Sequence, residues 1–314
     1  MHAATISDGQ VAVAEHPDPV AGPGEVLVRV RAAGVNGADL LQRKGAYPAP
    51  PGSPADIPGL ELAGEVARTG PGAERFAVGD RVMAIVGGGG QAEMAVVHER
   101  QLMPVPGDLD WPQAGGIAEV FTTAHDALFT QCALAPGERL LVHGAAGGVG
   151  TAAVQLGAAC GAHVTATVRR AESRDAVAAL GAHAVIDPEG FVDAGPFDVI
   201  LELVGAPNLP EDLKALHTGG RIVVIGVGAG AKAQVNLLAL MGKRATLRAS
   251  TLRARPLEEK AQTARAMERH VLPLLERGDV TVPVAQTFAL DAVHDAYEAF
   301  AAGGKVGKIV LLTG

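Results

Sequence analysis

The segment from Gly144 to Gly150 consists almost entirely of glycine and alanine, and it is the stretch best suited to chemistry. It follows a short apolar run at 140–142, and a helical pattern begins directly after it at Thr151. Small side chains let the backbone of such a turn come close to a phosphate group. The helix that follows offers unpaired N–H groups and the positive end of its dipole to the same phosphate. The order of strand, glycine turn and helix therefore predicts a dinucleotide-binding site.

Two arginines, Arg169 and Arg170, follow the second expected strand of this region, which ends at Val168. In a site for NAD, an acidic residue about 20 positions after the glycine turn accepts a hydrogen bond from the ribose 2′-hydroxyl. That acid is missing here, and a guanidinium pairs well with a phosphate. The arginines therefore favour NADP(H) over NAD(H), with Arg174 as a further candidate one helical turn later. The alternative is that they are solvated residues at the start of a helix.

Metal-ligand patterns are missing from the sequence. The two cysteines, Cys132 and Cys160, have neither metal-ligand spacing nor the spacing of a disulfide framework. The ten histidines are scattered singly, and no HExxH motif is present. We therefore expect no bound metal, and we expect both cysteines to be buried thiols in a reducing cytosol.

From position 140 onward, apolar runs alternate with helical patterns, which is typical of a parallel sheet covered by helices. Strands are expected at 140–143, 164–168, 184–187, 197–203 and 221–225. Helices are expected at 148–160, 171–180 and 207–217. A further strand is expected at 245–251 and a long amphipathic helix at 257–277.

The first 116 residues have a different pattern, rich in glycine, proline and short β-like runs. Strands are expected there at 24–32, 60–69 and 80–86, and a short helix at 38–43. Residues 47–58 form a proline-rich loop, and 87–90 is a glycine run that is either mobile or packed against another segment. The tail at 286–313 returns to a strand–helix–strand pattern, and we expect it to rejoin the N-terminal domain.

Composition narrows the classes of protein. The 314 residues are 48% apolar but only 3% aromatic, so a sizeable core must consist of alanine, valine, leucine and isoleucine. The net charge of −8 argues against a nucleic-acid partner. Residues 140–168 carry no charge and are long enough to span a membrane, but the glycine turn favours a buried strand–helix–strand unit. No signal peptide is recognisable, so we expect a cytoplasmic protein without a membrane contact.

Several segments together resemble a known superfamily. They are AAGVNGADLLQRKGAYP at 32–48, PGLELAGEVARTGPG at 58–72, VGDRVMAI at 78–85, HGAAGGVGTAAVQL at 143–156 and GKVGKIVL at 304–311. The chain resembles the medium-chain dehydrogenase/reductase superfamily, and within it the zinc-independent, zeta-crystallin-like quinone oxidoreductases. The resemblance implies an α/β fold with two domains. A doubly wound parallel Rossmann sheet is expected in residues 117–280, and a β-rich GroES-like domain in 1–116 and 281–314.

The resemblance also implies a site in a cleft between these domains. Asn36 and Tyr47 are the implied catalytic residues, near the nicotinamide and the substrate. The cofactor-binding residues, including the two arginines, are expected to be Thr123, Gly147, Gly148, Val149, Arg169, Arg170, Val204, Gly205, Gly226, Val227, Leu252 and Lys305. Relatives hold the 2′-phosphate with a lysine and a tyrosine where this chain has Ser173 and Pro188, so the arginines are the natural replacements.

Zinc enzymes of the superfamily carry a cysteine where this chain has Asn36 and a histidine where it has Leu60. Leucine cannot ligate zinc, and an amide is a poor substitute for a thiolate. Glu61 remains, but alone it is better explained as a structural residue. Each of these residues also has an interpretation without a functional role. Asn36 would then be a turn residue, Tyr47 a packing aromatic and Lys305 a solvated loop residue.

The resulting hypothesis is an NADPH-dependent reductase that transfers hydride to a small-molecule quinone, an acceptor that needs no metal. One alternative is reduction of an enone or enoyl thioester. Another is a protein that binds NADPH, RNA or a protein partner with little turnover, and a zinc alcohol dehydrogenase is the least favoured. We expect a homodimer in which the edge strand at 245–251 pairs with its counterpart.

Overall fold

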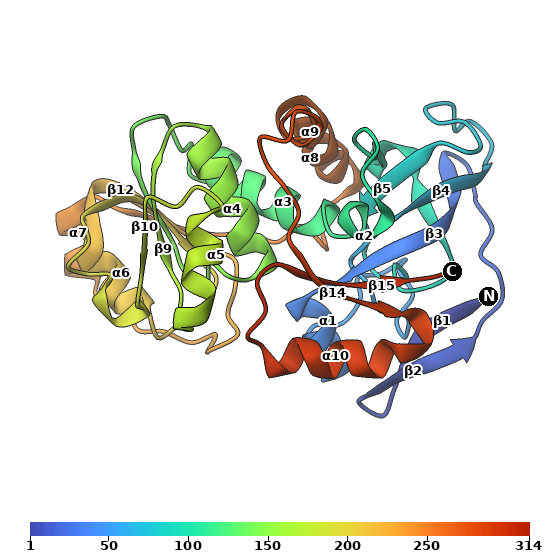
Figure 1. Ribbon diagram of the computed structural model, residues 1–314, viewed down its shortest axis with the longest axis horizontal. Coiled ribbons are helices and arrows are strands. Elements are labelled where there is room, and N and C mark those ends of the chain that lie inside the picture. The colour runs from blue at the N-terminus through green and yellow to red at the C-terminus, as the bar shows by residue number, and fades with distance from the viewer. The chain divides into compact units, whose positions relative to one another are not determined.

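The computed structural model describes the whole chain, residues 1–314. It contains two compact units, many of whose elements are labelled in Figure 1. Unit 1 comprises residues 1–122, 252–303 and 308–314, and unit 2 comprises residues 123–251 and 304–307. None of the helices combines the length and the apolar character needed to cross a lipid bilayer. Both cysteines are free thiols, as expected, but only Cys132 is buried, whereas Cys160 is half-buried.

Unit 2 is built on six strands in the order β10-β9-β8-β11-β12-β13, and every neighbouring pair is parallel. Counted within the unit, this is the order 3-2-1-4-5-6 of a doubly wound Rossmann sheet, which confirms the expected fold class. The strands are β8 (Arg139–Val142), β9 (His163–Thr167), β10 (Ala184–Ile186), β11 (Phe197–Glu202), β12 (Leu216–Val224) and β13 (Thr246–Ala249).

The helices of unit 2 are α4 (Gly148–Ala159), α5 (Arg174–Ala178), α6 (Leu209–Ala215) and α7 (Leu237–Lys243). The other helical segments are the π-helix η2 (Asp126–Gln131) and the 3-10 helices η3 (Ala171–Ser173) and η4 (Pro188–Gly190). Two expected helices are shorter than predicted. The helix at 171–180 is split into η3 and α5, and the helix at 207–217 ends at Ala215. The second difference arises because Leu216, which is fully buried, already pairs with Phe197 as the first residue of β12.

Unit 1 contains a seven-stranded sheet ordered β14-β15-β3-β4-β5-β7, with β6 also paired to β3. Its strands are β3 (Glu25–Val35), β4 (Glu61–Thr69), β5 (Arg81–Ile85), β6 (Met94–His98), β7 (Met103–Pro104), β14 (Val284–Ala289) and β15 (Lys308–Leu312). A separate hairpin is formed by β1 (His2–Ser7) and β2 (Gln10–Glu15). The sheet supplies the β-rich domain that the sequence predicted.

The tail rejoins the N-terminal part of the chain, as expected. Strand β15 runs antiparallel to β3, with Ile309 opposite Val35, and β14 runs parallel to β15. The remaining helices are α1 (Gly37–Arg43), α2 (Trp111–Ala114), α3 (Ala118–His125), α8 (Leu257–His270), α9 (Leu272–Glu276) and α10 (Val293–Ala302), with the short turns η1 (Glu99–Gln101) and η5 (Leu290–Ala292).

The long helix expected at 257–277 is two helices, α8 and α9, separated at Val271. Pro273 lies in the first turn of α9, where its ring is tolerated, whereas it would break a continuous helix. Residues 252–280 belong to unit 1, whereas we expected them in the Rossmann domain. The reason is that α8 is bonded to this unit, for example by Arg265 Nη2 donating to the Leu102 carbonyl at 2.6 Å.

The glycine run at 87–90 is packed rather than mobile. A Cβ atom at Gly87 would lie 2.1 Å from Ser53 Oγ of the proline-rich loop, and one at Gly90 would lie 2.6 Å from the Glu61 carbonyl oxygen. Only glycine allows these approaches, so the run fixes the proline-rich loop against the start of β4.

Candidate active site

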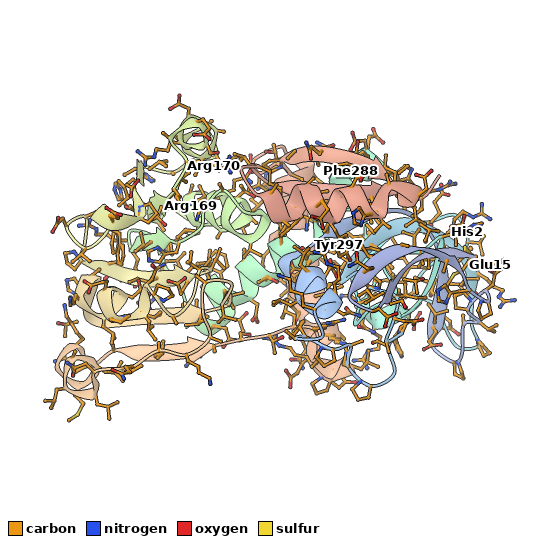
Figure 2. The ribbon with its side chains drawn as sticks, turned by 90° about the horizontal axis from the view of Figure 1, so that it is seen from below. His2, Glu15, Arg169, Arg170, Phe288 and Tyr297 are labelled. Atoms are coloured by element: carbon orange, nitrogen blue, oxygen red, sulfur yellow. The ribbon has the colours of Figure 1, made fainter.

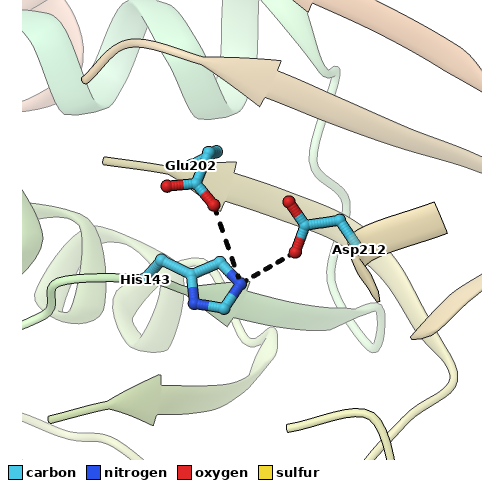
Figure 3. Close-up of side chains that lie close together, drawn as sticks. All are labelled: His143, Glu202 and Asp212. Atoms are coloured by element: carbon cyan, nitrogen blue, oxygen red, sulfur yellow. Dashed lines mark hydrogen bonds and ion pairs between the residues drawn. The ribbon is translucent and has the colours of Figure 1, made fainter. Parts of the chain in front are cut away.

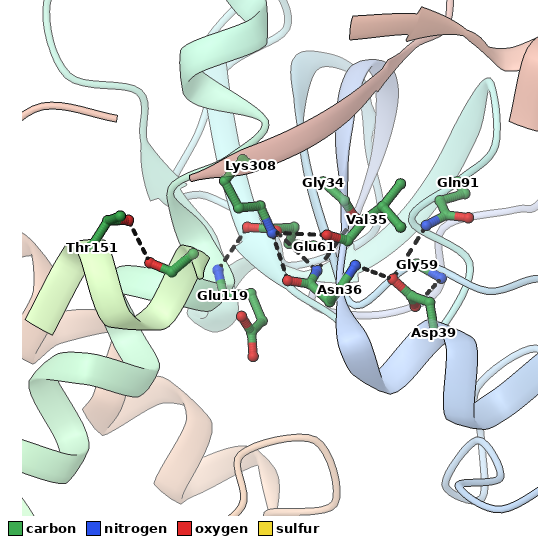
Figure 4. A network of polar contacts seen from close by, with 11 residues as sticks. Gly34, Val35, Asn36, Asp39, Gly59, Glu61, Gln91, Glu119, Thr151 and Lys308 are labelled. Carbon is green, nitrogen blue, oxygen red and sulfur yellow. Dashed lines mark hydrogen bonds and ion pairs between the residues drawn. The ribbon is translucent and has the colours of Figure 1, made fainter. Parts of the chain in front are cut away.

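The glycine turn of unit 2 is tight and ends at a helix N-terminus. Helix α4 begins at Gly148, and its N-cap Gly147 offers no side chain to the first N–H groups of the helix. A Cβ atom at Gly150 would lie 2.5 Å from the Gly144 carbonyl oxygen, so this position requires glycine. Thr151 Oγ1 donates to the Gly148 carbonyl at 2.9 Å (Figure 4). Gly147, Gly148 and Val149 therefore lie together at the N-terminus of α4, a type of backbone arrangement that can bind an anion.

The segment 304–307, far along the chain, lies against this turn. Gly307 donates its N–H to the Ala146 carbonyl at 2.9 Å and forms a parallel bridge with Gly147. A Cβ atom at Gly304 would lie 2.3 Å from Arg170 Nη1, so the guanidinium of Arg170 packs directly on the backbone of this segment. The structure therefore brings Lys305, in the same segment, into the region of the glycine turn and of Arg170.

Arg169 and Arg170 both follow β9 and are exposed (Figure 2). Arg170 lies 3.8 Å from Glu172, and its side chain is 47% exposed. Arg174 has another role than the one expected for it. Its Nε donates to the Val168 carbonyl at 3.2 Å, and its Nη2 lies 2.8 Å from Asp187 Oδ2. Because this guanidinium ties the ends of β9 and β10 together, the structure leaves Arg169 and Arg170 as the candidates for a phosphate.

The loops after β11 and β12 are packed closely against one another. A Cβ atom at Gly205 would lie 2.6 Å from the Gly230 carbonyl oxygen, and one at Gly226 would lie 2.2 Å from the Leu203 carbonyl oxygen. Ala229 donates its N–H to the Val204 carbonyl at 2.9 Å. The structure thus brings Val204, Gly205, Gly226 and Val227 together at the carboxyl edge of the sheet.

The remaining implied cofactor residues lie elsewhere. Thr123 is in α3 and is 6% exposed. Leu252 belongs to unit 1, where it lines a small pocket together with Met103 and Lys260. Burial in this region lowers the pKa of Lys260.

A buried cluster that the sequence did not reveal lies below the glycine turn. His143 directly precedes the turn, Glu202 ends β11 and Asp212 lies in α6, and all three are fully buried (Figure 3). His143 Nε2 lies 2.9 Å from Asp212 Oδ1 and 3.9 Å from Glu202 Oε2. The candidate ligand atoms of the three side chains all lie within 4.8 Å of one another.

In unit 1, Asn36 is the centre of a buried polar network (Figure 4). Its Oδ1 accepts a hydrogen bond from Lys308 Nζ at 2.5 Å, and its Nδ2 donates to Glu61 Oε1 at 3.0 Å and to the Gly34 carbonyl at 3.3 Å. Lys308 Nζ also contacts Glu61 Oε1 at 2.7 Å. Asn36 is only 6% exposed, and its side chain makes three hydrogen bonds inside the unit. Its role is therefore more than that of a turn residue.

Asp39 extends this network from the first turn of α1. Its carboxylate accepts hydrogen bonds from the N–H of Asn36 at 2.8 Å, from the N–H of Gly59 at 3.1 Å and from Gln91 Nε2 at 3.3 Å. Complete burial nevertheless raises the pKa of Asp39 to about 6. Asp39 therefore links α1, the start of β4 and the end of the glycine run.

Tyr47 is half-buried and is held by Arg253, a residue that no sequence motif indicated. The Arg253 guanidinium lies 5.0 Å from the centre of the Tyr47 ring, and its Nη1 donates to the Tyr47 carbonyl at 2.9 Å. The same side chain donates to the Gly87 carbonyl at 2.8 Å and to Gln42 Oε1 at 2.5 Å. Arg253 thus joins α1, the proline-rich loop and the glycine run, and burial lowers its pKa.

The residues of unit 1 do not fit a catalytic zinc ion. Asn36 presents an amide that already accepts from Lys308, and Leu60 has no ligand atom. Glu61 is the one carboxylate of the set, and it is neutralised by the ammonium of Lys308. Zinc prefers thiolate, imidazole and carboxylate ligands, so this donor set cannot hold it in the usual way.

Comparisons with known proteins agree with this architecture. Residues 22–107 match the family model of the alcohol dehydrogenase GroES-like domain, and residues 148–269 match that of the zinc-binding dehydrogenases. The chain is 32% identical to a quinone oxidoreductase of Lama guanicoe, over 94% of this chain and 90% of that protein. It is 33% identical to a quinone oxidoreductase of Pseudomonas aeruginosa, over 93% of this chain and 92% of that protein.

Two further likenesses bear on the choice of cofactor and acceptor. A solved mycobacterial protein in complex with NADPH superposes with a TM-score of 0.88, at 26% identity over the whole of both chains. The polyketide synthase GfsB of Streptomyces halstedii is 35% identical over 92% of this chain, which corresponds to 5% of that protein.

Proposed function

Because this chain belongs to the quinone oxidoreductases of the medium-chain dehydrogenase/reductase superfamily, we propose that it reduces a quinone with NADPH and without a metal ion. It is an enzyme of the quinone oxidoreductase type. What we propose in addition is that it prefers NADPH to NADH and that its acceptor is a quinone.

The observation that carries the proposal is the set of cations around the glycine turn. Arg169 and Arg170 follow β9, where an NAD site has an acidic residue, and Arg170 packs on the segment that contains Lys305. A guanidinium forms charge-assisted hydrogen bonds with a phosphate. The helix N-terminus at Gly148 suits the diphosphate, so the arginines are available for a 2′-phosphate.

NADPH, when bound, supplies the hydride, and the acceptor gains one proton in addition to become a hydroquinone. A quinone is electron-poor and needs no Lewis acid to accept hydride. The task of this chain is to hold the acceptor and to donate hydrogen bonds where negative charge develops on its oxygen. We assign this task to Tyr47, oriented by Arg253. Both N–H groups of the Asn36 carboxamide already donate to Glu61 and Gly34, so we assign Asn36 the role of holding this buried network together.

The network around Lys308 supports a reaction without zinc. The ammonium of Lys308 donates hydrogen bonds to both Asn36 and Glu61. These are the two polar residues at the positions where zinc enzymes of the superfamily have their ligands. Because the charge of the Glu61 carboxylate is already balanced by the buried ammonium of Lys308, it does not attract a second cation such as zinc.

Reduction of an enoyl thioester is the second candidate. It is favoured by the similarity to a segment of a polyketide synthase, at 35% identity over 92% of this chain. An enoyl thioester, like a quinone, accepts hydride at an electron-poor carbon. The two candidates differ in the acceptor alone, so the rate of NADPH oxidation with a quinone and with an enoyl thioester distinguishes them.

A homodimer is proposed through the edge of the sheet in unit 2. Strand β13 is the last strand of the sheet, with one edge unpaired. Next to it in the chain, α7 exposes Leu237, Leu238 and Met241, by 67%, 78% and 70% respectively. Replacing Leu238 by glutamate should convert the dimer to a monomer in light scattering, and an unchanged mass would exclude this surface.

The direct test is NADPH oxidation followed by absorbance with a panel of quinones, enones and enoyl thioesters. The proposal expects the highest kcat/KM with a quinone. Turnover with none of the acceptors, together with tight NADPH binding, would favour a binding protein instead.

A further inference from the structure

We propose that Glu202 is a positioning residue that sets the shape of the cofactor-binding loops through its carboxylate, next to His143, which Asp212 holds in place. The inference rests on the proposed function, because it assigns the loops after β11 and β12 to the cofactor. It assigns a role to Glu202, which binds the backbone of Val204 and Gly205 and which the sequence pattern did not indicate.

The carboxylate of Glu202 turns the chain after β11. Its Oε1 accepts hydrogen bonds from the N–H groups of both Val204 and Gly205, the second at 2.7 Å. Gly205 has φ +118°, a conformation that residues other than glycine rarely adopt. One oxygen atom therefore binds two successive N–H groups and fixes an unusual backbone turn.

The turn after β11 also determines the position of the loop after β12. Gly226 donates its N–H to the Glu202 carbonyl at 3.1 Å, and Ala206 donates to the Gly230 carbonyl at 2.9 Å. These contacts leave no room for a Cβ atom at either Gly205 or Gly226. A displaced Glu202 would therefore move both loops, and with them Val204 and Val227.

The imidazole of His143 lies next to the carboxylate of Glu202, with Nε2 3.9 Å from Oε2. Its Nδ1 lies 3.1 Å from Thr167 Oγ1 at the end of β9, and its Nε2 faces Asp212 Oδ1 at 2.9 Å. The N–H of His143 donates to the Leu201 carbonyl at 3.0 Å. The cluster thus joins the carboxyl ends of β8, β9 and β11, which are the strand ends that carry the proposed site.

The protonation state of Glu202 should affect the turn that it holds, and this effect can be measured. Glu202 Oε2 and Asp212 Oδ2 are buried and accept no hydrogen bond. Burial raises the pKa of Glu202, and the charge of Asp212 adds to this, whereas His143 and the two N–H donors oppose it. The ionised carboxylate is the stronger acceptor, so protonation of Glu202 should loosen the turn.

The test compares two substitutions at this position. Glu202→Ala removes both acceptors and should raise the Kd for NADPH by about tenfold or more, as expected for charge-assisted hydrogen bonds. Glu202→Gln keeps an oxygen that can accept both N–H groups, so its Kd at pH 8 should stay within about threefold of the parent. The KM for NADPH of the alanine variant should rise more than its kcat falls, because the loops bind the cofactor.

The 2′-phosphate of NADPH also titrates in this pH range, and it affects both proteins equally. Dividing the Kd of Glu202→Gln by the parent Kd at each pH therefore cancels its effect. Since the protonated carboxyl accepts only through a neutral carbonyl oxygen, as glutamine does, the parent should lose its advantage of up to about threefold over Glu202→Gln as pH falls from 8 to 5. Asp198→Asn is the matched control. Asp198 lies on the same strand and accepts the Arg139 N–H at 2.9 Å at the opposite end, so its ratio should not change with pH.

Several outcomes would overturn the inference. One is an alanine variant that is folded and binds NADPH like the parent, and another is a pH-independent ratio for Glu202→Gln. A stoichiometric divalent metal ion that is lost on Asp212→Asn would also overturn it, because Glu202 would then be a metal ligand. If the parent binds no NADPH at all, the proposed function itself fails, and the two failures are distinguishable.

Discussion

Lys308 and Glu61 form a buried ion pair, with Nζ 2.7 Å from Oε1 and the two side chains 3% and 0% exposed. Lys308 begins β15 and Glu61 begins β4, and both strands run antiparallel to β3, which lies between them. Asn36 follows the end of β3 and contacts both partners. The ion pair therefore bridges three strand ends at one edge of the sheet, and this arrangement fixes the Asn36 carboxamide.

Lys308→Met should destabilise the protein strongly, because it leaves the carboxylate of Glu61 buried without its cation. The expected loss in free energy of unfolding is about 3–5 kcal/mol, as for other broken buried pairs. Urea denaturation measures it. Arg31→Met is the matched control, since the Arg31–Glu65 pair joins β3 and β4 at 2.8 Å but is 30% and 36% exposed. Its loss should stay below about 1 kcal/mol, and equal losses for the two variants would contradict the role of burial.

Asp39 should make stability depend on pH. Burial raises its pKa from 3.8 in the unfolded chain to about 6 in the folded protein. The folded state therefore binds the proton more tightly, and the contribution of Asp39 to stability becomes more favourable as pH falls from about 7 to about 4. At 1.36 kcal/mol per pKa unit the change is about 3 kcal/mol.

The measurement for Asp39 is the difference in unfolding free energy between the parent and Asp39→Asn, from urea titrations at several pH values. This difference should shift in favour of the parent as pH decreases. A constant difference across this range would show that Asp39 has an ordinary pKa in the folded protein.

The double substitution Arg169→Ala, Arg170→Ala should weaken NADPH binding by at least about tenfold through the lost charge-assisted hydrogen bonds. NADH lacks the 2′-phosphate, so its Kd should change little. Arg174→Ala serves as the control, because that guanidinium is paired with Asp187 at 2.8 Å. Equal weakening of NADPH and NADH by the double substitution would mean that the arginines do not recognise the 2′-phosphate.

Arg253→Met should lower kcat for quinone reduction by at least about tenfold while the Kd for NADPH stays within about twofold. The reason is that the guanidinium orients Tyr47 and anchors Gly87, and methionine can do neither. Stopped-flow absorbance separates the rate of hydride transfer from binding. If kcat is unchanged in a folded variant, Tyr47 acts as a packing residue.

The repeating pattern of unit 2 made its fold predictable from the sequence. Alternating apolar runs and helical periods marked the parallel strands, and the glycine turn was recognised because its sequence order is local. The hairpin of β1 and β2 was missed, although its turn residues Asp8 and Gly9, with φ 50° and 74°, are a known hairpin signal.

The contacts that complete the site were not predictable in the same way. Lys308 reaches Asn36, Arg253 reaches Tyr47, and Asp212 reaches His143 across long stretches of sequence. No periodicity or motif encodes these distances, because they arise only when separate strands are brought together. The sequence therefore indicated Asn36 and Tyr47 but not the residues that hold them.

We propose that this enzyme passes hydride from NADPH to a quinone without a metal ion. The most direct measurement is anaerobic single-turnover oxidation of NADPH, with enzyme treated with a chelator and verified to be free of metal, mixed with a quinone. We expect oxidation of one NADPH per quinone at the same rate before and after chelation, and a much lower kcat/KM with NADH. Loss of the reaction on chelation with recovery on adding zinc, or no oxidation with any quinone, would contradict it.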